Sequence, residues 1–464
     1  MSQTQRCSSS HRRRRRLLAV LAVGGLVLAA CGNSGDDDDE ATPTTVSTDE
    51  TTDTTAASEE FVPVDAPGVT DDEIRFAAFG TDSNNPLGTC NLACFVDGIE
   101  AYFAFRNSEG GVHGRQLVLS TVLDDELVNN QQRALEILSA DDTFGAFSAT
   151  QLPSGWANFA DAGVPLYVWA IHFAEMAGRD SIFGNAGVQC TTCSARFGMY
   201  AAHEAGATTI ASLGYGVSSA SKDCASSNRT SIERYGDELG LTLGYFNDNL
   251  DFGLPNGIGP EVTAMKQAGV DFVMACIDLN GQKTLAQELE RQGMGDVHML
   301  HSNTYDQAFV RAAGDLFEGD FIGVGFRPFE ADPADSQLAD FQQWMEETGS
   351  ELTEPAMVGW INADLAYEGL VAAGPAFDRA SVIAATNQLT DFTAGGLIPP
   401  IDWSRQHEAP TEDDRATHGS AEDCFAYVQV HGGELSLVGE ADAPWVCWDG
   451  TNRDWSDPEP TNFQ

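Results

Sequence analysis

Eight cysteines have the spacing that could give disulfides, a zinc site or a redox pair. Besides Cys7 and Cys31 near the N-terminus, the chain has Cys90, Cys94, Cys190, Cys193, Cys224, Cys276, Cys424 and Cys447. An even number of cysteines is typical of a disulfide set, although eight allow on the order of a hundred pairings. Pairing of sequence neighbours predicts Cys90–Cys94, Cys190–Cys193 and Cys424–Cys447, which leaves Cys224 for Cys276.

Zinc binding and redox chemistry are the alternatives to these disulfides. Cys90-x3-Cys94 and Cys190-x2-Cys193 have spacings that a four-thiolate zinc site would accept. A redox role for Cys190 and Cys193 is less favoured, because nothing in the surrounding sequence would activate a thiolate. The N-terminal segment described below predicts export from the cytoplasm to an oxidising compartment, where disulfides form readily. Export therefore favours the disulfides over a zinc site, and we expect no metal.

Sequence motifs for catalysis are missing. No Gly-x-Ser-x-Gly elbow occurs, and His203-Glu204 lacks a second histidine four residues after the first. The glycines from Gly253 to Gly259 do not follow the strand-to-helix context of a nucleotide loop. We expect neither an enzyme nor a cofactor; the enzymatic alternative is a hydrolase whose site is assembled from distant residues.

The N-terminal residues 1–30 are typical of a secretory signal peptide. Arg12 to Arg16 precede fourteen mostly apolar residues, Leu17 to Ala30, too few to span a bilayer permanently. Leu28-Ala29-Ala30-Cys31 resembles the bacterial lipoprotein box, whose cysteine is lipidated. We expect an extracytoplasmic protein anchored through Cys31 to the outer face of the cytoplasmic membrane. An ordinary signal peptide with a chance cysteine is the alternative.

The exported part of the chain is strongly acidic. Six of the 24 Lys+Arg and none of the 70 Asp+Glu precede Cys31, which leaves 18 basic against 70 acidic side chains and a net charge of −52. This charge argues against nucleic acid as a partner, because phosphate binding relies on Lys and Arg. Most carboxylates are expected to be solvated surface groups. The acidic, Thr- and Ser-rich residues 31–67 predict a disordered tether.

Beyond the tether, short apolar strands alternate with helical periods in two successive sets. This alternation is typical of doubly wound parallel sheets and predicts an α/β fold with two lobes. Strands are expected at 74–80, 117–123, 144–147 and 164–169, then at 209–215, 241–246, 272–277 and 297–300, with helices such as 154–161 and 227–239 between them. Three helices (333–347, 358–373, 379–389) and two strands (425–430, 435–438) follow these two sets in the sequence. We expect them to pack onto the lobes that the preceding residues form.

A series of short motifs accompanies these elements. Glu109-Gly110-Gly111-Val112-His113-Gly114-Arg115 forms a Gly-rich turn, and Asp124-Asp125 follows the next strand. Ser148-Ala149-Thr150-Gln151 with Ser154, Ala162-Gly163-Val164-Pro165 and Ala268-Gly269-Val270-Asp271-Phe272 come later. Their order and spacing over residues 69–373 resemble the type I periplasmic binding proteins, most closely the Leu/Ile/Val-binding branch that serves ABC importers. Residues 398–464 match less well.

The resemblance implies two doubly wound lobes joined by a three-crossover hinge that closes on a ligand. Carried over, the crossovers lie near residues 183–185, 325–329 and 397–402. Lobe 1 would then comprise residues 69–184 plus 328–398, and lobe 2 residues 185–326 plus 400–460.

Ligand contacts are expected where the strands end, because open parallel sheets bind ligands at their carboxyl edge. In lobe 1 this rule nominates Thr81, Thr150, Gln151, Ser154, Trp169, Ala170 and His172. In lobe 2 it nominates Tyr215, Ser218, Asp278, Asn280, Asn303 and Tyr305.

The resemblance also implies roles for these residues in holding an amino acid. Thr150, Gln151 and Ser154, with loop amides near Ala170 and His172, would receive a carboxylate. Asp278 would take an ammonium in a charge-assisted pair, and the aromatics Trp169, Tyr215 and Tyr305 would form the walls.

Each of these residues also has a purely structural interpretation. Asp278 could instead cap the helix that follows it, as could Thr150 and Ser154. Trp169 could belong to the core, and His172 could serve only to hydrogen-bond a loop.

The resemblance therefore implies a lipid-anchored receptor for a small-molecule solute, an amino acid or a related amide, which it delivers to an ABC transporter permease. A sensory receptor of the same fold, without transport, is the alternative.

Overall fold

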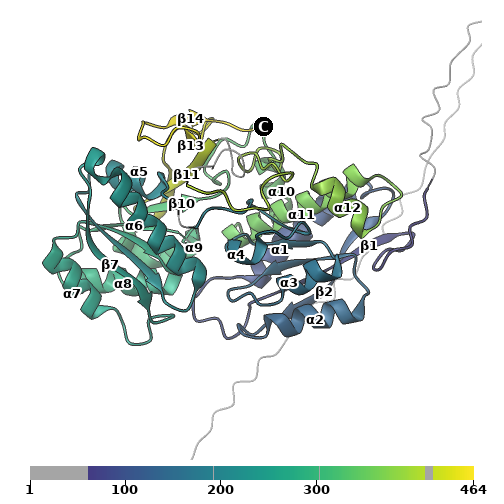
Figure 1. The fold of residues 1–464 in the computed structure, drawn as a ribbon, viewed down its shortest axis with the longest axis horizontal. Helices are drawn as coiled ribbons and strands as arrows, with labels where there is room; N and C mark the ends of the chain where they lie inside the picture. Colours follow the sequence, from purple (N-terminus) through teal and green to yellow (C-terminus); the bar gives the residue numbers. More distant parts are fainter. Residues whose placement is uncertain (1–60, 192, 303, 413–421) are drawn as a thin grey trace, which may run out of the picture. The chain divides into compact units, whose positions relative to one another are not determined.

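The computed structural model describes residues 61–464, except residues 192, 303 and 413–421 (Figure 1). The predicted signal peptide, the lipidation site Cys31 and residues 31–60 of the expected tether lie outside the described residues. Within the part that is described, no helix is both long and apolar enough to cross a membrane.

Lobe 1 is built on a five-stranded parallel sheet with the strand order β2-β1-β3-β4-β5. Every residue of β3, β4 and β5 is buried, as expected for parallel strands covered by helices on both faces. The strands are β1 (Glu73–Gly80), β2 (Gln116–Asp124), β3 (Gly145–Ala149), β4 (Leu166–Val168) and β5 (Ile182–Gly184).

Helices from two distant parts of the chain cover this sheet (Figure 1). Four come from the first part of the chain: α1 (Leu92–Ser108), α2 (Asn130–Ala140), α3 (Trp156–Ala162) and α4 (Phe173–Met176). Three return late: α10 (Leu338–Thr348), α11 (Glu354–Ala373) and α12 (Arg379–Thr386). Helix α11 lies close against α1, because a Cβ on Gly98 or Gly359 would collide with backbone oxygen of the other helix.

Lobe 2 has a mixed sheet with the order β14-β13-β11-β10-β9-β8-β6-β7, in which β12 also pairs with β11. Strands β6 to β10 are parallel, whereas β11, β13 and β14 extend the sheet in antiparallel fashion. The strands are β6 (Thr209–Tyr215), β7 (Thr242–Leu250), β8 (Phe272–Cys276), β9 (His298–His301), β10 (Phe321–Val324), β11 (Glu422–His431), β12 (Glu434–Leu437), β13 (Trp445–Asp449) and β14 (Glu459–Thr461). The helices are α5 (Phe197–Glu204), α6 (Ser219–Leu239), α7 (Gly259–Ala268), α8 (Leu279–Arg291), α9 (Gln307–Ala313) and the 3₁₀ turn η1 (Gly314–Phe317).

The expected α/β class with two parallel-sheet lobes is confirmed, and two local differences affect the site. Helix α6 begins at Ser219, eight residues before the expected start, because the Ser218 side chain accepts a hydrogen bond from the Ser221 amide and caps the helix. Helix α4 was not expected, and it follows His172 directly.

The chain passes between the lobes three times, after β5, after β10 and after α12. Two of the passages are joined to each other, because the amide of Arg327 donates to the carbonyl of Leu397 at 2.7 Å. The buried Arg327 guanidinium also donates to the Asn462 side chain and to the Asp332 carbonyl. The end of the chain is thereby fastened to the segments that connect the lobes.

The eight cysteines form the four predicted pairs, Cys90–Cys94, Cys190–Cys193, Cys224–Cys276 and Cys424–Cys447. Each sulfur is bonded within its own pair, so these sulfurs do not form the four-thiolate zinc site considered as an alternative.

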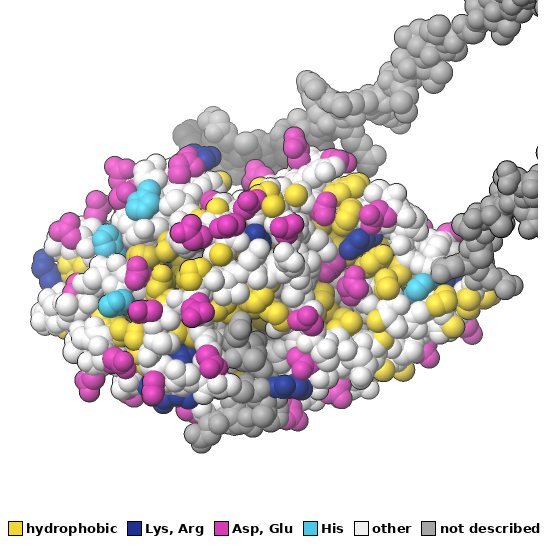
Figure 2. Space-filling view, turned by 90° about the horizontal axis from the view of Figure 1, so that it is seen from above, with side chains coloured by type: hydrophobic (Ala, Val, Ile, Leu, Met, Phe, Trp, Pro, Cys, Tyr) yellow, Lys and Arg dark blue, Asp and Glu magenta, His cyan; other side chains and the backbone are white. Residues whose placement is uncertain are grey.

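Acidic side chains are spread over the face of the molecule shown in Figure 2, among few Lys and Arg. They are interspersed with apolar and uncharged groups rather than gathered in one patch, which agrees with their expected role as solvated surface groups.

Candidate ligand-binding site

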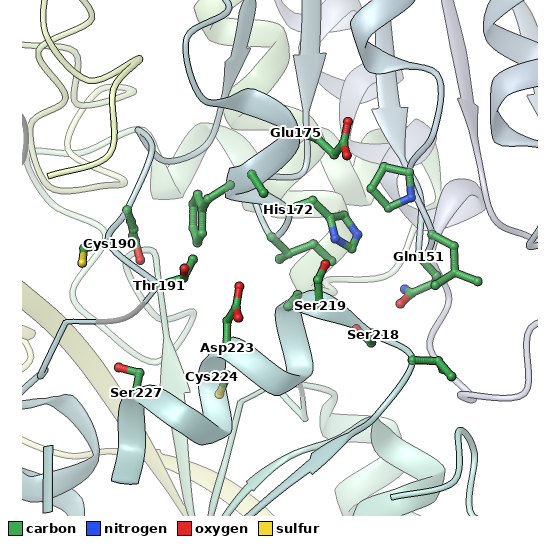
Figure 3. A pocket seen from close by; sticks show the side chains of 18 residues that line it. Gln151, His172, Glu175, Cys190, Thr191, Ser218, Ser219, Asp223, Cys224 and Ser227 are labelled. Atoms are coloured by element: carbon green, nitrogen blue, oxygen red, sulfur yellow. The ribbon is translucent and has the colours of Figure 1, made fainter. Parts of the chain in front are cut away.

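A cavity of about 330 Å³ lies between the lobes, at the carboxyl ends of β3, β4 and β6 (Figure 3). Lobe 1 contributes the loops that follow β3 and β4, lobe 2 contributes the start of α6, and the first crossover contributes residues 189–191. Three of the residues nominated from sequence line it, namely Gln151, His172 and Ser218.

The lobe 1 wall is held by hydrogen bonds between neighbouring strand ends. Thr150 Oγ1 donates to Asp125 Oδ2 at 2.8 Å, and the Gln151 amide donates to Thr81 Oγ1 at 3.2 Å. Both threonines are buried, so their side chains position the loop. The side chain of Gln151 is left to face the cavity.

His172 is buried at the edge of the cavity and is neutral at pH 7. Burial lowers its pKa to about 4, although the hydrogen bond to the Thr150 carbonyl acts in the opposite direction. Nε2 lies 3.1 Å from that carbonyl oxygen and must therefore carry the proton. Nδ1 is then an acceptor, and it has no hydrogen-bond partner among the described residues.

The lobe 2 wall is the first two turns of α6. Ser221 fixes the start of the helix, because its hydroxyl accepts from the Tyr215 amide and donates to the Cys276 carbonyl. The disulfide between Cys224 and Cys276 holds the next turn against the end of β8. These contacts turn Ser219 and Asp223 towards the cavity (Figure 3).

Asp223 is the acidic group of lobe 2 that lines the cavity. Partial burial raises the pKa of its carboxyl, while a hydrogen bond from Thr191 and the charge of Lys222 lower it. Thr191 also lines the cavity and comes from the first crossover, so the carboxylate is held at the junction of the lobes.

Asp278 occupies a different environment and is only 5% exposed. It is the N-cap of α8, since its Oδ1 accepts from the Gly281 amide at 3.0 Å. Its Oδ2 accepts a hydrogen bond from the Tyr215 hydroxyl. Burial raises the pKa of this carboxyl, and the hydrogen bonds from Tyr215 and Gly281 oppose the shift. The capping interpretation of Asp278 therefore describes what the side chain does in this structure.

Asn280 joins the two lobes beside Asp278. Its backbone amide donates to the Leu87 carbonyl at 3.1 Å, and its side-chain amide donates to the Pro86 carbonyl at 2.9 Å. Leu87 is buried at this contact. The loop between β1 and α1, whose Cys90 is bonded to Cys94 in the first turn of α1, therefore rests on the start of α8.

The remaining nominated residues lie away from this cavity. Trp169 is buried in the core, and the Ala170 amide donates to Asn185 Oδ1 at 2.9 Å. Ser154 Oγ accepts from the amide of Gln131 in α2, and the N-cap of α3 is Gly155, so the prediction that Ser154 caps the helix that follows it is wrong. The Tyr305 hydroxyl donates to Glu330 Oε2, and its ring borders a second cavity of about 20 Å³. Asn303 lies outside the described residues.

Reasoning from strand ends missed six polar residues of the cavity, namely Glu175, Gln189, Thr191, Ser219, Asp223 and Ser227. Three of them lie in α6, and recognition of Ser218 as a helix cap would have placed the start of this helix near the carboxyl end of β6. Glu175 lies in the four-residue helix α4, and Gln189 and Thr191 lie in a crossover without a regular element; none of these three carries a sequence signal of this kind.

No group of three or more His, Cys, Asp or Glu side chains in the described ranges could hold a metal ion.

Solved structures with this arrangement of lobes include several transport proteins. A fatty acid ABC transporter substrate-binding protein from Thermomonospora curvata is 18% identical, with a TM-score of 0.61 over 81% of this chain and 94% of that chain. A leucine-binding protein from Thermotoga maritima is 13% identical, with a TM-score of 0.61 over 79% and 98%. A branched-chain amino acid ABC transporter protein from Thermus thermophilus, with bound valine, is 17% identical, with a TM-score of 0.60 over 79% and 96%. At these identities the similarity shows the fold.

No curated protein sequence matches this chain. The profile of the periplasmic binding protein family matches residues 73–434, which include the lobe 1 sheet, the lobe 2 strands β6 to β11 and all three passages between the lobes. That family consists of proteins that bind solutes rather than transform them. On the sequence match and the fold together, the chain belongs to the periplasmic binding protein family.

Proposed function

We propose that the protein is an extracytoplasmic receptor that captures a small polar solute between its lobes and delivers it to an ABC permease. The observation that carries this proposal is the cavity of about 330 Å³ whose wall is shared by loops of lobe 1 and helix α6 of lobe 2. A ligand that contacts both lobes binds the closed arrangement more tightly than the open one, and so shifts the population towards closure. A permease can then recognise the closed form.

The cavity suits an amino acid or a related amide. Its volume is at the lower end of the range of about 300–1,000 Å³ that is usual for small-ligand sites. Polar side chains such as Gln151, Ser218 and Thr191 favour a hydrogen-bonding ligand over a fatty acid chain. Phe173 and Val217 supply apolar surface for a small side chain, in keeping with the leucine and valine named for the neighbouring structures.

The residue assignments made from sequence carry over as part of this proposal. We assign residues 69–184 with 328–398 to lobe 1 and residues 185–326 with 400–460 to lobe 2. The first set contains β1 to β5 and the second contains β6 to β13, while β14 ends one residue beyond it; these positions support the assignment. Gln151, His172 and Ser218 are supported as ligand contacts because they line the cavity.

We also propose that Cys31 carries a lipid and that the acidic residues 31–67 form a tether to the folded body. The apolar run before Cys31 and the small residues next to it support this. Confinement to the membrane surface raises the effective concentration of the receptor at a permease without requiring a tight interface.

Thermal unfolding with a panel of amino acids, amides and small polyols tests the binding function. A ligand at a hundred times its dissociation constant stabilises the folded state by about 2.7 kcal/mol, which raises the melting temperature by several degrees. The variant Ser219→Phe places a large ring in the cavity and should lose the shift while keeping the circular dichroism of the wild type. If no compound shifts the wild type, or if Ser219→Phe shifts equally, the cavity is not the binding site.

A further inference from the structure

The cavity between the lobes carries an unbalanced negative charge. Glu175 from lobe 1 and Asp223 from lobe 2 both line it, and no Lys or Arg is among the described residues that do. Lys222 adjoins Asp223 in sequence but does not line the cavity. A carboxylate taken out of water costs free energy unless a cation accompanies it. Closure of the lobes over these two groups would therefore favour a ligand that brings positive charge.

Asp223 is available to a ligand, whereas Asp278 is already occupied. Both oxygens of Asp278 accept hydrogen bonds within the protein, and the side chain is 5% exposed. Asp223 is only partly buried, and Figure 3 shows its carboxylate extending from α6 towards Thr191 and the space below α4. The cation partner that sequence reasoning placed at Asp278 is therefore better provided by Asp223.

His172 adds a second, independent preference for a hydrogen-bond donor. Nε2 donates a hydrogen bond to the Thr150 carbonyl, which leaves Nδ1 as a buried acceptor with no partner among the described residues. A buried acceptor without a donor is unfavourable, and the ring belongs to a residue that lines the ligand cavity. Nδ1 itself has almost no exposed area, so an ammonium or amide N–H group of a ligand would reach it only after a small movement of the ring or of the lobes; a carboxylate oxygen could not satisfy it at all.

Resting on the proposed function, we propose that the receptor selects ligands with a net positive charge, such as amino-acid amides, basic amino acids and aliphatic diamines. Their cationic nitrogen is held by Asp223, with the hydroxyls of Thr191 and Ser219 nearby, and His172 accepts from a donor of the ligand. Zwitterionic amino acids bind more weakly, and anionic ligands are rejected by Asp223 and Glu175.

Titration calorimetry with ligands matched in shape tests the preference. Leucinamide, leucine and N-acetylleucine share one side chain and are cationic, zwitterionic and anionic, respectively, at pH 7.4; lysine and 1,4-diaminobutane extend the cationic set. The purified mature protein should bind at least one of the cations, leucine more weakly, and N-acetylleucine not at all. Tighter binding of leucine or N-acetylleucine than of every cation would overturn the charge preference while leaving the receptor function intact. Binding of no compound would count against both.

Variants locate the charge. Asp223→Asn should weaken binding of the cation by about 10- to 100-fold, as expected for loss of a charge-assisted hydrogen bond, and Asp223→Glu should recover part of it. Asp237→Asn removes an exposed carboxylate from the same helix and should leave affinity unchanged. Asp278→Asn tests the alternative, in which Asp278 holds the cation. The assignment to Asp223 is wrong if Asp278→Asn abolishes binding while Asp223→Asn still binds the cation, with circular dichroism showing that both variants are folded.

Discussion

At the scale of single residues, the position of a side chain at a strand end predicts that it lies near the cavity, but it does not predict whether the side chain faces a ligand or makes a structural hydrogen bond. The carboxyl ends of β3, β4 and β6 could be predicted, so Gln151, His172 and Ser218 could be nominated for the cavity that they do line. Asp223 could not, because it faces the cavity only by virtue of where α6 begins. The choice between a helix cap and a free carboxylate at Asp278 depends on contacts with Tyr215 that come from another strand.

His172 makes stability depend on pH. Its pKa is about 4 in the folded protein and about 6.5 when unfolded, so between these values the unfolded chain binds more protons. The free energy of unfolding should therefore fall as the pH falls from about 6.5 to 4, by about 3 kcal/mol from this residue. Urea unfolding at several pH values should show that His172→Gln loses about that much less over the same interval.

A matched control for this experiment is His431→Gln, which removes an exposed imidazole. His407, whose pKa burial also lowers, is present in all three proteins and contributes equally. Parallel curves for wild type and His172→Gln would show that the imidazole is not buried in its neutral form.

At the scale of elements, the alternation of strands and helices was predictable, but the late additions were not. Apolar runs in β1, β3, β4, β6 and β8 indicate parallel strands, because such strands are buried on both faces, whereas the edge strands β2 and β7 are only partly buried. β13 (Trp445–Asp449) and β14 (Glu459–Thr461) lie in a Gly-, Asp- and Pro-rich tail, and they are strands only because β13 pairs with β11 and β14 pairs with β13. Helix α11 is buried almost all round, so its sequence lacks the periodicity that would show which face meets α1.

The contact between the β1–α1 loop and α8 depends on Gly88. This residue has φ of +81°, and a Cβ there would meet the Asn280 side chain at 2.8 Å. Gly163 also has positive φ, +62°, but faces open space. Gly163→Ala should cost about 1 kcal/mol from backbone strain alone, and Gly88→Ala clearly more.

Chemical unfolding of these variants as a double-mutant cycle isolates the contact. In the background of Asn280→Ala, the excess cost of Gly88→Ala over Gly163→Ala should disappear, because the side chain that would collide is gone. If the excess persists, the loop does not rest on Asn280 in solution.

The disulfide between Cys224 and Cys276 links α6, and hence Asp223, to the end of β8. It spans 52 residues, so the paired replacement by serine should lower the unfolding free energy by about 4 kcal/mol in the chain-entropy picture. It should also weaken ligand binding, because the cavity wall loses its fixed position. Thermal unfolding and calorimetry on the same samples measure both effects.

The Cys424–Cys447 disulfide provides the comparison. It spans 23 residues between β11 and β13, neither of which lines the cavity, and its removal should cost about 3.5 kcal/mol without weakening binding. Equal losses of affinity in the two double variants would show that the effect on binding is general destabilisation.

At the scale of the whole molecule, the sequence predicts a lipid anchor at Cys31, and the structure shows the two-lobed body that this anchor would hold at the membrane. The cavity of about 330 Å³ lies between two lobes joined by three passages, and a small rotation at these passages would change the separation of the cavity walls. The net charge of −52 beyond the predicted signal peptide favours solubility, which suits a protein that works outside the cytoplasm. It also suits a cleft that recruits cations, because the surrounding field has the sign that attracts them.

The anchor is tested by fractionation of cells that express the full chain. Wild type should be found with membranes, and Cys31→Ser should be released in soluble form, because a chain without the lipid has only the short leader as an apolar segment. Mass spectrometry of the N-terminal peptide should show the lipid on Cys31 in the wild type. Recovery of both proteins in the soluble fraction would contradict the lipid anchor.

Ligand-driven closure is the central claim, and small-angle X-ray scattering measures it most directly. With a cation that calorimetry shows to bind, the mature protein should have a smaller radius of gyration than the unliganded protein, and Ser219→Phe should show no change with the same compound. A bound ligand that leaves the scattering of the wild type unchanged would contradict closure of the two lobes on a solute.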